Sequence, residues 1–239
     1  MSGRCLDDIM SLCRHVNVPI RKRGIFMKKL IAAALALIML VPLTGCGLSK
    51  LTNKGKADAD ATVSAAADSK LTRGTWQNGS YTNDYVSFTF TPPENWVVST
   101  DEELADLMGA DVGEAGEDLS GVDIVYDTLV QDPDSFDNVF IMYENVNIFG
   151  GAIVSTQAIM DEIVSQMEDS NDGTKYTHVG NAEYAIGSDK YLCAEFDVEV
   201  SGISFKQYVL LHKLGRFIAN ITITDVTGAS LDYYLGMFS

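Results

Sequence analysis

Hydrophobic and polar residues alternate along the C-terminal two thirds of the chain in a pattern that predicts mainly strands. The first alternating run covers residues 85–91, with Val86, Phe88 and Phe90 on one face, and Pro92 and Pro93 end it. Further runs of strand type follow at 122–130, 139–146, 176–179, 191–200, 203–212 and 217–224. Ser201–Gly202 and Lys213–Gly215 are short enough to predict tight turns between the last three strands.

Three segments have helical spacing instead. Thr100 and Glu103 form a capping box for a helix over 101–108, which Gly109 can end. Ser155 or Thr156 can cap a second, amphipathic helix. Its apolar positions are Ile159, Ile163, Val164 and Met167, and those of a closing helix are Leu231, Tyr234, Leu235 and Phe238. Hairpin strands with helices inserted between them predict a single α+β domain over 76–239, with a central antiparallel sheet flanked by helices.

Residues 27–45 have the three parts of an export signal. Lys28 and Lys29 give a cationic start, and residues 30–43 are apolar. This apolar stretch is shorter than the roughly 20 residues that a helix needs to cross a membrane. It matches the apolar region of a cleaved signal peptide, so we expect export and not a permanent span.

Leu43, Thr44, Gly45 and Cys46 resemble the lipobox of bacterial lipoproteins. The resemblance implies a diacylglyceryl group on the Cys46 sulfur and cleavage between Gly45 and Cys46. Two acyl chains give durable attachment, because each buried CH₂ contributes about 0.8 kcal/mol. We therefore expect a protein anchored by lipid to the extracytoplasmic face of the cell membrane. The alternative is an ordinary secretory signal followed by an incidental cysteine.

The segments on either side of the signal differ from it in character. Residues 1–26 are polar and precede the usual start of a signal, so we interpret them as an upstream extension and Met27 as the true start. Residues 46–75 are rich in small and polar residues and predict a lipid-anchored flexible tether. Beyond Cys46 only Cys193 remains, which rules out a disulfide within the predicted domain.

The chain is strongly acidic, with a formal net charge of −16 and no Lys or Arg between Gly74 and Thr174. Such a surface repels nucleic acid, which is excluded as a partner, and attracts cations or basic proteins. The alternative is a solvated acidic face that only keeps the protein soluble.

Asp132, Asp134 and Asp137 are the candidate metal ligands, with Ca²⁺ as the cation that their hard oxygens suit. The spacing departs from an EF-hand loop, where Phe136 should be acidic, and aspartates in turns commonly cap backbone groups. Beyond this candidate cation and the lipid on Cys46, we expect no cofactor. Tyr81, Tyr85 and Tyr143 could line a sugar or peptide groove or pack as half-buried strand residues.

Catalytic motifs are not evident. His178 and His212 fall in predicted strands, without a nucleophile elbow or a zinc motif around them. We expect no enzyme activity. An extracytoplasmic hydrolase is the alternative, because a triad is assembled in space and not along the sequence.

The strand ending in Phe88-Thr89-Phe90, followed by Pro93-Glu94-Asn95-Trp96, and a late meander containing Gln207 and Tyr208 resemble the PsbP-like sandwich. That fold is shared by an extrinsic photosystem protein, a yeast Ran-binding factor and lipoproteins of the DcrB type. The resemblance implies adaptor-like binding without catalysis and transfers no binding residues. We therefore expect a lipid-anchored, non-catalytic binding module, with another envelope protein as a possible partner.

Overall fold

The structure is a computed structural model that describes residues 70–114, 116–146 and 155–239. Gly45, Cys46, the predicted signal and most of the predicted tether lie outside the described residues. Contacts divide the chain into Met1–Leu37 and Ile38–Ser239, and every described residue belongs to the second unit. In the described ranges, no helix has the length and apolar character needed to cross a membrane.

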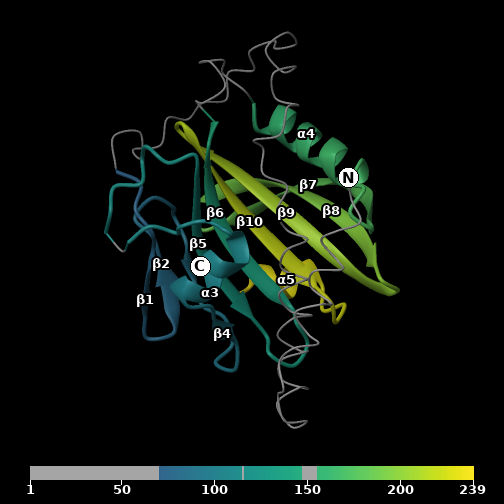
Figure 1. The fold of residues 1–239 in the computed structure, drawn as a ribbon, viewed down its shortest axis with the longest axis horizontal. Helices are drawn as coiled ribbons and strands as arrows, with labels where there is room; N and C mark the ends of the chain where they lie inside the picture. The colour runs from purple at the N-terminus through teal and green to yellow at the C-terminus, as the bar shows by residue number, and fades with distance from the viewer. Residues whose placement is uncertain (1–69, 115, 147–154) are drawn as a thin grey trace, which may run out of the picture. The chain divides into compact units, whose positions relative to one another are not determined.

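A seven-stranded antiparallel sheet forms the centre of the domain (Figure 1). Its strand order is β4–β5–β6–β10–β9–β8–β7. The strands are β4 Val97–Val98, β5 Ile124–Gln131, β6 Asn138–Asn145, β7 Thr174–Ile186, β8 Asp189–Val200, β9 Ile203–Leu214 and β10 Phe217–Asp225. The last four form a meander, and β10 then pairs with β6, which joins the two halves of the sheet.

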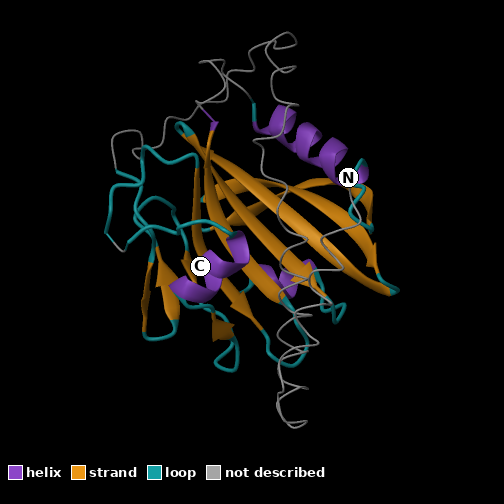
Figure 2. Ribbon diagram, in the orientation of Figure 1, coloured by secondary structure: helices purple, strands orange, loops and turns teal. Residues whose placement is uncertain are grey.

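A second, three-stranded sheet contains β1 Thr75–Gln77, β2 Ser80–Thr82 and β3 Thr89–Phe90. The helices of the described ranges are α3 Asp101–Met108, α4 Thr156–Glu168 and α5 Leu231–Leu235. Helix α3 packs against β5, and α4 packs across β7, β8 and β9. Figure 2 shows how much more strand than helix there is. The antiparallel sheet is as predicted, but the domain is β-rich with two sheets, and not an α+β domain with a sheet flanked by helices.

The main hydrophobic core fills the space between the two sheets. Odd-numbered residues of β6, such as Ile141 and Tyr143, belong to it together with Phe90 from the small sheet and Phe238. The Phe90 and Phe238 rings stack with centroids 4.8 Å apart. Even-numbered residues of β6 are also buried, and β10 is buried along its full length. Both faces of these central strands are therefore covered, which explains the continuous apolar run Val139–Tyr143 in β6.

Elements with strong local signals match their predictions. Helix α3 spans 101–108, has both bonds of the Thr100–Glu103 capping box, and ends at Gly109 with φ 62°. Ser155, not Thr156, caps α4. Ser201 and Gly202 form the predicted two-residue turn, with φ 51° and 81°. The next turn consists of Gly215 and Arg216, slightly beyond the predicted Lys213–Gly215, because β9 continues to Leu214.

The predicted opening strand over 85–91 is wrong for most of its length, since only Thr89–Phe90 is a strand. The Asn83 side-chain oxygen accepts a hydrogen bond from the Tyr85 amide at 2.8 Å, and the Asn83 carbonyl accepts one from the Val86 amide at 3.2 Å. These bonds bend the chain into a turn. The two short strands before it, β1 and β2, were not predicted.

Strand β7 is much longer than the predicted 176–179. Its second half is exposed from Asn181 to Glu183, so the apolar pattern ends long before the strand does. A bulge interrupts its pairing with β8 between His178 and Gly180. At this margin of the sheet, the His178 amide donates to a carboxylate oxygen of Glu168 in α4 at 3.2 Å.

The folded domain begins earlier than the predicted boundary at residue 76. Leu71 is fully buried in the core, and its amide donates to Ser120 Oγ at 3.0 Å. The Leu119 amide in turn donates to the Leu71 carbonyl at 2.8 Å. Leu71 and Arg73 therefore belong to the domain, although the sequence pattern places them in the tether.

The β7–β8 turn at Gly187 generates a stability prediction. Gly187 has φ 59°, and a Cβ there would collide with the Ser87 carbonyl. We expect Gly187→Ala to lower the free energy of unfolding by about 1–3 kcal/mol, measured by urea denaturation. Gly121→Ala is the matched control, because nothing lies within 4 Å of a Cβ there. Equal stability of the two variants would contradict this description of the turn.

Candidate functional site

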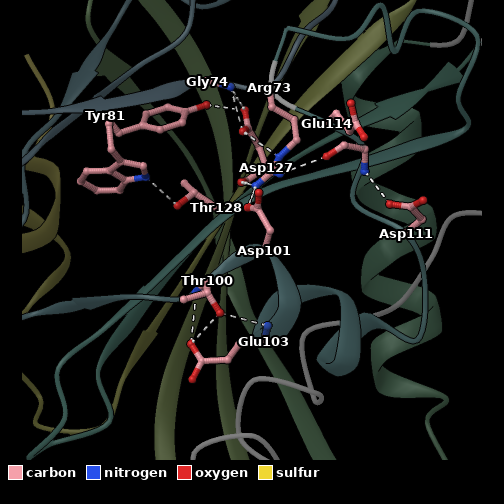
Figure 3. A network of polar contacts seen from close by, with 12 residues as sticks. Arg73, Gly74, Tyr81, Thr100, Asp101, Glu103, Asp111, Glu114, Asp127 and Thr128 are labelled. Atoms are coloured by element: carbon pink, nitrogen blue, oxygen red, sulfur yellow. Dashed lines mark hydrogen bonds and ion pairs between the residues drawn. The ribbon is translucent and has the colours of Figure 1, made fainter.

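A buried carboxylate, Asp127, lies where a bulge interrupts the pairing of β5 with β6. Its side chain accepts hydrogen bonds from the Gly74 amide at 2.9 Å, the Tyr81 hydroxyl at 2.5 Å and the Asn83 amide group at 3.0 Å. Tyr143 extends the cluster, with its hydroxyl 3.1 Å from that of Tyr81. Figure 3 shows Tyr81, Gly74 and Arg73 converging on Asp127.

Arg73 completes this network with a side chain that is only 9% exposed. One terminal nitrogen donates to Asp101 at 2.6 Å and to the Asp127 carbonyl at 2.9 Å. The other donates to the Gly113 carbonyl at 3.2 Å. Its Nε lies 3.9 Å from the Asp127 carboxylate. One guanidinium therefore joins the N-terminal segment to β5, to the start of α3 and to the loop beyond α3.

Burial and hydrogen bonding act in opposite directions on these groups. Burial raises the pKa of Asp127, while the bonds from Tyr81, Gly74 and Asn83 and the Arg73 charge oppose that rise. Burial and the nearby Asp127 charge raise the pKa of Tyr81, so its phenol stays protonated and donates. The hydrogen bond from Arg73 lowers the pKa of Asp101, which keeps that exposed carboxylate ionised. Both Asp127 carboxylate oxygens already accept hydrogen bonds. The network is therefore suited to holding the N-terminal segment against β5.

The loop held by Arg73 belongs to an exposed acidic run, residues 101–123, which we call the acidic tract. Its exposed carboxylates are Asp101, Glu102, Glu103, Asp106, Asp111, Glu114, Glu117, Asp118 and Asp123. No Lys or Arg interrupts the tract. Buried Leu104, Val112 and Leu119 fix it to the body of the domain. The tract therefore presents concentrated negative charge on a fixed frame.

The meander carries no comparable excess of charge. Its acidic residues between Thr174 and Phe217 are Glu183, Asp189, Glu195, Asp197 and Glu199, and its basic residues there are Lys175, Lys190, Lys206, Lys213 and Arg216. Lys206 lies between two of these carboxylates, 3.0 Å from Asp197 and in contact with Glu195. The negative charge of the domain thus lies mainly before the meander, and the acidic tract carries nine of these carboxylates.

The candidate cation ligands Asp132, Asp134 and Asp137 do not converge. Asp132 accepts from the Asp134 amide at 2.9 Å, which is a turn-capping bond. The buried Asp137 side chain instead accepts from the Val226 amide at 2.8 Å and from the Thr227 amide and hydroxyl. In the described ranges, no group of three or more His, Cys, Asp or Glu residues is arranged to hold a metal ion.

His178 and His212 each have a neighbour suited to holding the ring in place. Asn181 lies 2.8 Å from the His178 ring. The His212 Nδ1 lies 2.8 Å from the Lys190 carbonyl, and its Nε2 lies 3.8 Å from Asp189. Ser87 donates to the other Asp189 oxygen at 2.5 Å. Asp189 thus lies between the serine and the histidine, whereas a nucleophilic triad needs the imidazole between serine and carboxylate.

The residues considered for a groove or for thiol chemistry are interior residues. Tyr81 and Tyr143 are fully buried and Tyr85 is 6% exposed, so these tyrosines line no open groove. Cys193 is buried and free, and burial raises its pKa to about 12. The thiolate needed for reactivity is therefore scarce at neutral pH.

Sequence reasoning missed a set of buried polar residues on the central strands. The Thr222 hydroxyl donates to the Asn220 side chain at 3.1 Å, and Asn220 donates to Glu144 at 3.3 Å. All three residues are at most 5% exposed. The signal that could have revealed them is a polar residue inside an otherwise apolar strand, as in the run 217–225.

Comparisons with known proteins give no family assignment. No protein-family model and no curated protein sequence matches the chain. Among solved structures, the solution structure of cyanobacterial PsbP (CyanoP) from Synechocystis sp. PCC 6803 is similar at 10% identity and a TM-score of 0.43. That match covers 77% of this chain and 97% of CyanoP.

A crystal structure of a protein from Bacteroides thetaiotaomicron VPI-5482 is similar at 16% identity and a TM-score of 0.38. The match covers 67% of this chain and 46% of that protein. Both TM-scores lie below 0.5, so the fold described here rests on strand order and packing.

The Asp127 network generates a second stability prediction. Asparagine has one acceptor oxygen in place of two, so Asp127→Asn leaves buried donors unpaired and removes the buried one of the two carboxylates beside Arg73. We expect a loss of about 3 kcal/mol in the free energy of unfolding, measured by urea denaturation. Asp101→Asn, which removes the exposed partner of Arg73, should cost less than about 1 kcal/mol. If the order were reversed, Asp127 would not be the centre of this network.

Proposed function

We propose that the chain is an exported lipoprotein, anchored through Cys46, whose PsbP-like domain is a non-catalytic binding module. Location is inferred from the cationic start, apolar stretch and lipobox of residues 27–46. The predicted tether then leads to Leu71, which is already buried in the core of the folded domain. A folded domain attached to a lipid anchor would hold a binding surface on the outside of the cell.

The observation that carries the binding proposal is the acidic tract. It joins many exposed carboxylates to a backbone that Arg73, Val112 and Leu119 hold in place. A preorganised surface of one charge sign attracts partners of the opposite sign and speeds their association. The partner class that fits is a basic segment of another envelope protein.

The alternative is an extracytoplasmic hydrolase, and among the described residues Ser87, Asp189 and His212 bring a serine, a carboxylate and a histidine into contact. The carboxylate lies in the middle and accepts a hydrogen bond from the serine hydroxyl. The imidazole therefore does not contact the serine and cannot activate it as a base. This arrangement does not support a serine hydrolase, so we propose binding in preference to hydrolysis.

Anchoring is tested by replacing Cys46 with serine, which removes the thiol that accepts the lipid. In cells that express the full chain, we expect the wild-type protein in the membrane fraction at its processed mass. C46S should either be released in soluble form or stay with the membrane as a heavier precursor that keeps its signal peptide. Cys193→Ser is the matched control and should remain in the membrane fraction. Membrane retention of C46S at the wild-type mass would refute the anchor.

Binding is tested with a deca-lysine peptide as the probe. The tract variant removes four negative charges through Glu102→Gln, Asp106→Asn, Glu114→Gln and Asp123→Asn. The distal variant removes four charges elsewhere through Asp169→Asn, Glu183→Gln, Glu199→Gln and Asp232→Asn. All eight residues are exposed, so both variants should fold.

By fluorescence anisotropy at low salt, we expect the tract variant to bind the peptide at least about tenfold more weakly than wild type, and the distal variant to bind nearly as wild type. Tenfold corresponds to about 1.4 kcal/mol, which is reasonable for the loss of several rim charges. Equal weakening in the two variants would mean that net charge alone attracts the peptide and that the tract is not a binding surface.

A further inference from the structure

The turn between β7 and β8 is docked on Ser87 of the N-terminal segment. Gly187 approaches the Ser87 carbonyl so closely that a Cβ there would collide with it. The Ser188 amide donates to Ser87 Oγ at 3.3 Å, and the Ser87 hydroxyl donates to one Asp189 carboxylate oxygen at 2.5 Å. Asp189 is therefore the side chain through which the turn holds this segment.

His212 lies on the other side of the Asp189 carboxylate, beside the point where the pairing of β8 with β9 ends. Its Nδ1 lies 2.8 Å from the Lys190 carbonyl, and its Nε2 lies 3.8 Å from the second Asp189 oxygen. The ring packs on Tyr191, with centroids 5.0 Å apart. The His212 and Asp189 side chains are only 20% and 26% exposed. Each ring nitrogen thus has one defined neighbour.

These two neighbours decide which ring nitrogen carries a proton. A backbone carbonyl can only accept, so Nδ1 must carry a proton to bond with Lys190. In a neutral imidazole the other nitrogen is an acceptor, and its lone pair then faces the negative charge of Asp189. In the imidazolium both nitrogens are donors, and Nε2–H faces the carboxylate. The same geometry is therefore unfavourable with a neutral ring and favourable with a protonated one.

Two uncharged residues lie against the rest of the ring. Tyr191 of β8 packs on it, and Ala219 of β10 lies opposite His212 in the β9–β10 ladder. Burial raises the pKa of the Tyr191 phenol, which therefore stays neutral. Neither residue changes its charge near neutral pH.

The lysines of β8 and β9 lie away from the ring. Lys190 and Lys213 are sequence neighbours of the two packed rings, and adjacent side chains of a strand lie on opposite faces of the sheet. Lys190 pairs with Glu183 of β7 at 3.8 Å, and only its carbonyl contacts the imidazole. Among the described residues, Asp189 is therefore the charged group that faces Nε2.

We propose that His212, Asp189 and Ser87 form a proton-operated latch that holds the β7–β8 turn on the N-terminal segment. A proton taken up from water on Nε2 makes the imidazolium an ion-pair partner for Asp189, which fixes the carboxylate that binds Ser87. Release of that proton leaves a lone pair against the carboxylate and loosens the turn. The latch therefore stabilises the domain at acidic pH, and this contribution is lost as the ring loses its proton with rising pH.

The tautomer is tested by nitrogen-15 NMR of the histidine rings, because a bare and a protonated ring nitrogen have different chemical shifts. The His212 signals are assigned by their loss in His212→Asn. At pH 8.0 we expect a protonated Nδ1 and a bare Nε2, and at pH 5.5 we expect both nitrogens to be protonated. A proton on Nε2 at pH 8.0 would overturn the latch, since the neutral ring could then donate to Asp189. A ring still neutral at pH 5.5 would also overturn it.

The effect on stability is tested by urea denaturation of the wild type and His212→Asn at pH 5.5 and pH 8.0. Asparagine can still donate to the Lys190 carbonyl, but it takes up no proton. We expect the ratio of the wild-type to the variant folding equilibrium constant to be about fivefold larger at pH 5.5 than at pH 8.0. That factor is the upper range for a partly exposed ion pair.

Two further variants separate the latch from other effects of pH. His178→Asn is the matched control, because the His178 ring lies beside the Asn181 amide group, and its ratio to the wild type should not change with pH. In an Asp189→Asn background, His212→Asn should have the same effect at both pH values. The proposal is wrong if the wild-type ratio is independent of pH, or if its pH dependence survives Asp189→Asn.

Discussion

One buried carboxylate joins the N-terminal segment to the main sheet. The strands of that segment, β1 to β3, are each only two or three residues long and pair only with one another in their sheet. They are attached to β5 by the bonds from Gly74, Tyr81 and Asn83 to Asp127 and by the bond from the Trp76 indole to Thr128. The hydrophobic core between the sheets depends on this attachment, because Tyr81 and Phe90 contribute to it from the small sheet. Arg73 extends the same constraint to the acidic tract through Gly113.

The parts of the fold that could be predicted are those that neighbouring residues specify. A capping box needs only Thr100 and Glu103, and a two-residue turn needs only residues that tolerate positive φ, so α3 and the Ser201–Gly202 hairpin were predicted within a residue. The lengths of β8 and β10 followed from the alternation of apolar and polar residues along them. Strand β7 was cut short because its exposed half has no buried face to impose a pattern, and pairing with β8 alone holds it extended.

The network around Asp127 could not be predicted, because its donors lie 44 to 53 residues from it in the sequence. An Asp within a strand pattern looks like a solvent-facing residue until its partners are placed. The same limit applies to Asp137, whose partners at Val226 and Thr227 are about 90 residues away. Asp137 lies close in sequence to Asp132 and Asp134, which suggested a cation site. Its carboxylate is instead hydrogen-bonded to Val226 and Thr227. The excess of acidic residues between Gly74 and Thr174 was evident from sequence, but its position at the tether entry required the packing of Leu71 against Leu119 and Ser120.

The exposed edge of the main sheet, strand β7, affects how copies of the domain can associate. Strand β7 has no neighbour beyond it in the sheet order, and an open margin of this kind can recruit a strand from an adjacent molecule. The Glu168 carboxylate occupies the His178 amide, and the bulge beside it disturbs the spacing that a new strand would need. The proposed anchor would confine copies to two dimensions, where they meet at high local concentration. A margin blocked at His178 would then disfavour strand addition between neighbours.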